Sequence, residues 1–187
     1  MRNLSSLAFA IIALLVTPNL LADGSELIGA CAHCHGTDGN SSSGQYPSLA
    51  KQNKEYIVKQ LKDFKAGHRK NGQMSPMVGI LEESDMVLLA AYYNDQNPAK
   101  QKGIDGELVK MGQKFAKELG CASCHKANYR GVAEIPRLAR QKRVYLEKSM
   151  IDFRDGNRTN ADDTKIDAMK TLTDEQIVAI SHYLAGM

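Results

Sequence analysis

The feature that most constrains this chain is a five-residue pattern, Cys-x-x-Cys-His, which occurs twice and uses all four cysteines of the sequence. It reads CAHCH at residues 31–35 and CASCH at residues 121–125. The spacing is typical of covalent heme c attachment, in which two thiols hold one porphyrin and the adjacent histidine binds its iron. The sequence therefore predicts two hemes c. Their attachment residues are Cys31, Cys34, Cys121 and Cys124, and their proximal iron ligands are His35 and His125.

Paired cysteines have other uses, and each was weighed against heme attachment. A disulfide would suit an exported chain, a thioredoxin-like site also uses Cys-x-x-Cys, and four cysteines could bind zinc. None of these uses requires a histidine at the same place in both copies, and no βαβ pattern surrounds either motif. Heme attachment is the interpretation that the pattern favours.

The two motifs belong to two related halves of the chain. Residues 47–52 read PSLAKQ, and residues 136–141 read PRLARQ at nearly the same distance from their motif. A polar stretch at residues 97–103, NPAKQKG, has the composition of a linker. We therefore expect a tandem duplication with a first domain at 23–99 and a second at 103–187.

Both halves are expected to be helical, which makes the fold class all-α. Apolar residues recur at helical spacing, and strand patterns are almost absent. The expected helices span residues 25–32, 54–65, 84–94, 106–121, 143–154 and 173–185. Stretches rich in Gly, Asn, Ser and Asp at 36–44 and 157–163 are expected to be surface loops.

The first 22 residues have the pattern of a cleaved signal peptide. Arg2 supplies a positive start, residues 7–16 are apolar, and Ala22 is small enough to precede a cleavage site. A membrane anchor is the alternative, but this apolar run is much shorter than the roughly 20 residues that a spanning helix needs. We expect a periplasmic protein with at most peripheral membrane association.

With these motifs on both halves, the chain resembles the class I c-type cytochromes, and its duplicated form resembles the diheme cytochrome c4 family. The resemblance rests on the two Cys-x-x-Cys-His motifs, the two Pro-x-Leu-Ala-x-Gln segments and two helices ending in Gly-x-Arg. It implies two tandem class I cytochrome c domains, each wrapped around one covalently bound heme. It also implies that the carbonyls of Pro47 and Pro136 accept the Nδ1 protons of the proximal histidines.

The resemblance places the sixth iron ligand of the first domain at a methionine seven residues before a particular leucine. Met74 stands at this distance from Leu81, and Met77 is a nearby competitor. We expect Met74 to be the ligand, although a methionine is also an ordinary core residue.

The second domain departs from this pattern. The position seven residues before Leu172 is Lys165, and Met169 is the only methionine in the neighbourhood. A shifted loop could bring Met169 to the iron, or a deprotonated Lys165 could bind it. A third possibility is that Lys165 is solvated while Met169 lies in the core. The sequence leaves these alternatives open.

The expected function is single-electron transfer between redox proteins, from a dehydrogenase or quinol-oxidising complex to a terminal oxidase or other acceptor. The alternative is a redox enzyme, thiosulfate-oxidising or peroxidase-like, that uses an unusually ligated second heme. A formal net charge of +3 without a basic stripe does not suit a nucleic-acid partner. Two iron-binding residues at each heme favour the electron carrier, because no coordination position would remain open to a substrate.

Overall fold

The computed structural model describes residues 24–187, so the expected signal peptide at 1–22 lies outside the described residues. Within this range the regular structure is helical, apart from one isolated bridge between Val132 and Ile135. The all-α prediction is confirmed. The helices are α1 (Ser25–His35), α2 (Lys54–Lys65), α3 (Met74–Val78), α4 (Glu83–Asp95), α5 (Gly106–Glu118), α6 (Ala122–His125), α7 (Arg143–Arg154), α8 (Asp163–Lys170) and α9 (Asp174–Gly186).

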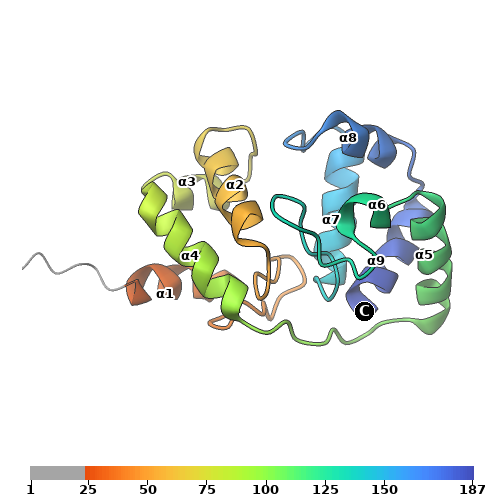
Figure 1. The fold of residues 1–187 in the computed structure, drawn as a ribbon, viewed down its shortest axis with the longest axis horizontal. Coiled ribbons are helices and arrows are strands. Elements are labelled where there is room, and N and C mark those ends of the chain that lie inside the picture. Colours follow the sequence, from red (N-terminus) through yellow and green to blue (C-terminus); the bar gives the residue numbers. More distant parts are fainter. Residues whose placement is uncertain (1–23) are drawn as a thin grey trace, which may run out of the picture.

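The helices form two lobes that follow the duplication of the sequence (Figure 1). In the first lobe, α2 packs against α3 and α4, and α1 packs against α4. In the second lobe, α9 packs against α5 and α7, and α7 packs against α8. The segment between α4 and α5 runs along one edge of the molecule and joins the lobes.

The repeated Gly-x-Arg pattern ends the equivalent helices α2 and α7 in the same way. Gly67 and Gly156 follow these helices, and both have φ of +76°, a left-handed conformation that glycine adopts without strain. The turn brings an arginine back over a phenylalanine of the helix in each lobe. Arg69 lies 4.5 Å from the ring centre of Phe64, and Arg158 lies 4.4 Å from that of Phe153.

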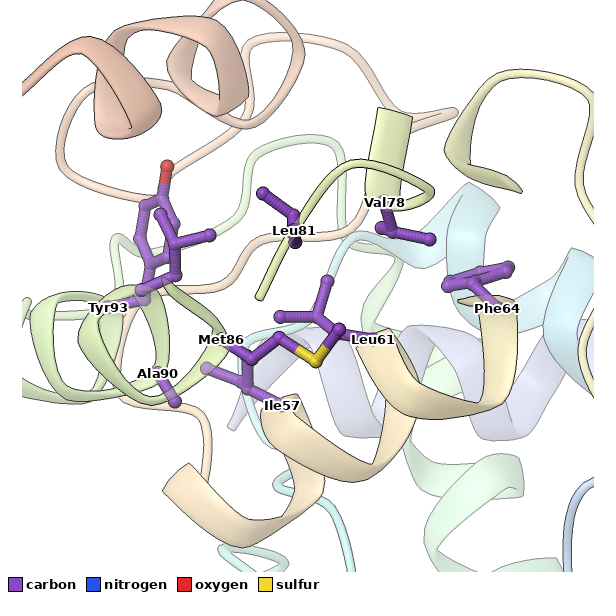
Figure 2. Packing of buried hydrophobic residues seen from close by; sticks show 9 residues of the cluster. Ile57, Leu61, Phe64, Val78, Leu81, Met86, Ala90 and Tyr93 are labelled. Atoms are coloured by element: carbon purple, nitrogen blue, oxygen red, sulfur yellow. The ribbon is translucent and has the colours of Figure 1, made fainter. Parts of the chain in front are cut away.

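Each lobe has its own hydrophobic core. Figure 2 shows the core of the first lobe, where side chains of α2 meet those of α4 and of the segment between α3 and α4. Its buried members are Ile57, Leu61, Phe64, Val78, Leu81, Met86, Leu89, Ala90 and Tyr93. The buried members of the second core are Ala116, Tyr129, Ala139, Leu146, Leu172, Ile177, Ile180, Leu184 and Ala185. Because domains of this size bury little surface on their own, a large apolar cofactor would add substantially to each core.

In the second core, α5 and α9 approach closely enough to require a glycine. A Cβ atom built on Gly112 of α5 would lie 2.0 Å from the carbonyl oxygen of Ala179 on α9. No side chain can be accommodated at that distance. The glycine therefore sets the spacing between these two helices.

The two Pro-x-Leu-Ala-x-Gln segments meet at the interface between the lobes. Gln52 donates from Nε2 to the carbonyl of Arg137 at 3.0 Å, and its Oε1 accepts from the backbone N–H of Arg137 at 2.7 Å. In the equivalent arrangement, Gln141 donates to the carbonyl of Ser48 at 2.9 Å and accepts from the backbone N–H of Ser48 at 2.7 Å. All four residues are buried. We call these two contacts the glutamine pairs.

A second reciprocal contact crosses the same interface. Nη2 of Arg69 donates to the hydroxyl of Tyr145 at 3.0 Å, and Nη2 of Arg158 donates to the hydroxyl of Tyr56 at 3.1 Å. Together with the glutamine pairs, these contacts relate the lobes by an approximate two-fold axis. Each half of the duplication thus uses the same residues to bind the other half.

Candidate heme sites

The two cysteine motifs lie at the ends of helical segments. The first occupies the last turns of α1, which continues to His35 rather than ending at residue 32 as expected. The expected helix at 106–121 ends earlier, at Glu118, because Gly120 has φ of +66°, and the second motif then continues into the short α6. The four cysteines form no disulfide with one another, and burial raises the pKa of the thiols of Cys31 and Cys121.

Both motif histidines are held by the prolines that the family resemblance implies. Nδ1 of His35 lies 2.9 Å from the carbonyl oxygen of Pro47, and Nδ1 of His125 lies 3.0 Å from that of Pro136. A carbonyl can only accept, so Nδ1 carries the proton and Nε2 keeps a lone pair for a metal. Burial lowers the pKa of His35 and lowers that of His125 to about 4. Both imidazoles are therefore neutral at physiological pH, which is the form that binds iron.

A cavity of about 780 Å³ lies beside the second motif. This volume is within the range of sites that hold organic ligands. Its walls include the motif residues, the proline that holds the histidine, both sixth-ligand candidates and residues of α2 from the first lobe. The wall residues of these kinds from the second lobe are Cys121, Cys124, His125, Pro136, Lys165 and Met169.

The structure separates the two methionine candidates of the first lobe. Met74 is the first residue of α3 and packs against the core cluster that Cys31 also contacts. Met77 lies at the surface with 49% of its side chain exposed. Of the two, Met74 is the half-buried one that contacts the same cluster as the motif cysteine.

Both candidates of the second lobe lie on α8, a helix that the sequence did not predict. Nζ of Lys165 is 3.9 Å from the ring centre of Phe153, and Met169 packs against the second core cluster. Like Met169, Lys165 lines the cavity beside His125. The side chain of Lys165 is therefore half-buried, with its amine over an aromatic ring.

Two buried guanidinium groups at the lobe interface are charged and have only neutral partners. Arg137 donates to the carbonyls of Ala50 and Ala139, and its Nε has no hydrogen-bond partner. Burial lowers the pKa of Arg137 to about 10, which leaves it charged at neutral pH. Arg158 donates to Asn160, Ser149, Tyr56 and Gln60. Neither arginine has a carboxylate within ion-pair distance among residues 24–187, so both suit an additional anionic group such as a heme propionate.

Comparison of the sequence with models of known families identifies one family. The chain matches the family model described as Cytochrome c in two places, residues 21–95 and 109–187. The chain therefore belongs to the cytochrome c family, with one heme c covalently attached in each of its two cytochrome c domains.

Individual relatives narrow the family to diheme proteins. The chain is 35% identical over 176 residues to cytochrome c4 of Pseudomonas aeruginosa, with 89% of this chain and 88% of that protein covered. It resembles the crystal structure of reduced recombinant cytochrome c4 from Pseudomonas stutzeri with a TM-score of 0.81 and 36% identity, covering 88% of this chain and 96% of that one. It is also 31% identical over 172 residues to the thiosulfate dehydrogenase electron acceptor of Stutzerimonas stutzeri, covering 84% and 79% of the two chains.

These relatives establish the general function. The chain is a diheme electron-transfer cytochrome of the cytochrome c4 type. Cytochromes c4 are electron carriers, so the prediction of a carrier rather than an enzyme is confirmed. Between residues 24 and 187, no helix has the length and apolar character needed to cross a membrane.

Proposed function

We propose that this protein is a periplasmic electron carrier that takes single electrons from a dehydrogenase or quinol-oxidising complex and delivers them to a terminal oxidase or other acceptor. The observation that carries the proposal is the repeated histidine arrangement, in which Pro47 and Pro136 hold neutral imidazoles beside two thiols. The export segment would be residues 1–22, and the domains would span 23–99 and 103–187.

Each domain would hold its heme through its own motif. Cys31 and Cys34 would form the thioether bonds of the first heme, with His35 and Met74 as its iron ligands. In the second domain, Cys121 and Cys124 would form these bonds, and His125 would be the proximal ligand. When bound, heme c supplies an iron that gains or loses one electron, while the protein sets its potential through the ligands and their surroundings.

The buried cations would stabilise the acidic groups of the cofactors. Arg137 and Arg158 are buried to 3% and 6% exposure, and their recorded partners are neutral. An ionised propionate beside either guanidinium would compensate its charge in a region of low dielectric constant. This pairing would also place charge at the interface of the lobes, where the reduction potential of one heme can depend on the oxidation state of the other.

A relative of this chain suggests the class of donor. Because one similar protein is an electron acceptor of thiosulfate dehydrogenase, we include a thiosulfate-oxidising enzyme among the upstream partners. Contacts between such redox partners are small and transient, which permits rapid exchange.

Two measurements on the holoprotein test this proposal. The intact mass should correspond to two hemes, and replacing both cysteines of one motif by alanine should remove one of them. The oxidised protein should accept two electrons per chain from thiosulfate dehydrogenase or a quinol-oxidising complex and lose them to oxidase-containing membranes. A mass with fewer than two hemes, or failure to exchange electrons with every donor and acceptor tried, would contradict the proposal.

A further inference from the structure

Lys165 and Met74 occupy equivalent places in the two lobes. Met74 lies seven residues before Leu81, and Lys165 lies seven residues before Leu172. The two leucines are anchored in their cores, with exposed fractions of 5% and 4%. Packing as well as sequence therefore supports treating Met74 and Lys165 as equivalent positions of the two lobes.

The local backbone geometry agrees with this register. The backbone N–H of Met74 donates to Oδ1 of Asn71 at 3.0 Å, and that of Lys165 donates to Oδ1 of Asp162 at 3.0 Å. In both lobes the accepting oxygen belongs to the side chain three residues earlier, which is the N-cap residue in α8 but not in α3. Met74 is the first residue of α3 and Lys165 is the third residue of α8, so both candidates lie in the first turn of their helix.

Met169 corresponds to a different residue of the first lobe. Counted from the anchoring leucine, its counterpart is Val78, which lies in the first core with 1% exposure. Met169 likewise packs against the buried cluster of the second lobe. Met169 also lines the cavity beside His125, and by register its side chain lies one helical turn away from the position of Met74.

The side chain of Lys165 lies in the wall of the cavity that also contains the proximal histidine. It lines the cavity together with His125, and Nζ stands 3.9 Å over the ring of Phe153, the counterpart of Phe64. In the part of the chain that the structure describes, Lys165 has no ion pair with a carboxylate. A metal bond would give this half-buried amine a stronger partner than the aromatic ring that it contacts.

We propose that Nζ of Lys165 is the sixth ligand of the second heme iron, so that the two hemes have His/Met and His/Lys ligation. The inference rests on the proposed function in taking His125 as the proximal ligand. One Fe–N bond forms from the lone pair of the amine, and the proton of the ammonium form goes to solvent without any change in oxidation state.

Unequal ligation would make the two hemes unequal in potential. A thioether ligand generally raises the reduction potential of heme iron, whereas an amine is a stronger donor and favours the ferric state. The second heme would therefore be harder to reduce than the first. Electrons would reside preferentially in the first domain when the protein is half reduced.

The test is low-temperature paramagnetic resonance with near-infrared magnetic circular dichroism on the oxidised holoprotein, because these spectra distinguish thioether from amine ligation. We expect one signal of each kind. Lys165→Met should replace the amine signal with a second thioether signal and raise the potential of the second heme, leaving the first unchanged. The matched control is Lys170→Met on the same helix, where Lys170 is 61% exposed and paired with Asp167. It should change neither spectrum nor potential.

A second variant keeps the test decisive if Lys165→Met does not fold. Met169→Leu retains the core volume and should preserve the amine signal. Two thioether signals in the wild-type protein, or loss of a ligand signal in Met169→Leu, would overturn the inference and assign the iron to Met169. An amine site that survives Lys165→Met would overturn it as well, leaving Lys165 as a partner of a propionate. Each of these results would leave the electron-carrier function intact, whereas a missing heme would not.

Discussion

The glutamine pairs make a quantitative prediction about how the two lobes are held together. Gln52→Ala removes two hydrogen bonds to the backbone of Arg137, whose N–H and carbonyl are buried between the lobes. Each bond contributes about 1 kcal/mol net, and a buried group left without a partner adds about 1–3 kcal/mol to the loss. If water satisfies one of the two groups, the free energy of unfolding should fall by about 3 kcal/mol.

Urea unfolding of the holoprotein measures this loss. With an m-value of about 2 kcal/mol/M, the midpoint should fall by roughly 1.5 M. Gln141→Ala should have a similar effect, because Gln141 makes the equivalent bonds to Ser48. Gln113→Ala, at an exposed position of α5, is the matched control. If Gln52→Ala and the control agree within about 0.5 kcal/mol, the account of the interface is wrong.

Three further predictions concern the second lobe. Gly112→Ala should lower the free energy of unfolding in urea by about 1–3 kcal/mol, because its Cβ would lie 2.0 Å from a backbone oxygen. Gly29→Ala is the control and should cost far less, since no atom lies near its Cβ. Equal losses in the two variants would contradict the packing. Asp105→Ala should lower the midpoint of thermal unfolding, since Oδ1 of Asp105 accepts two N–H groups of the first turn of α5; an unchanged midpoint would refute this cap. Nδ1 of His182 accepts from the backbone N–H of Asp105, and burial lowers the pKa of His182. The contribution of His182 to stability should therefore be complete above about pH 6.5. It should decline as the pH falls toward the lower pKa of His182 in the folded state. Thermal midpoints of His182→Gln should show a weaker decline than those of the wild-type protein, and identical pH profiles would contradict the assignment.

The parts of the fold that the sequence predicted are those with strong local signals. The helices at 54–65 and 143–154 have the expected bounds, because an amphipathic pattern defines them and a glycine ends them. The end of α1 was placed three residues too early, although Gly36, with φ of +82°, marks it. α3 and α8 were missed because they are too short for apolar periodicity to stand out from a loop.

The parts that the sequence could not supply depend on contacts between distant residues. The repeated glutamines were visible as a pattern, but their role requires knowing that Gln52 faces Arg137, 85 residues away. In the same way, register favoured Lys165 and the methionine ligand usual in the family favoured Met169, so the sequence left both as candidates. The backbone hydrogen bonds of Met74 and Lys165 and the core position of Val78 support the proposal of Lys165, and these contacts follow only from the packed structure.

The central claim is that one chain holds two covalently bound hemes in unequal ligand environments and carries up to two electrons. A spectroelectrochemical titration of the holoprotein, with heme content determined on the same sample, tests it most directly. The account predicts two hemes per chain and two resolved, reversible one-electron steps, with the lower potential shifted upward by Lys165→Met. A single heme per chain, or two steps at the same potential that Lys165→Met leaves unchanged, would contradict it.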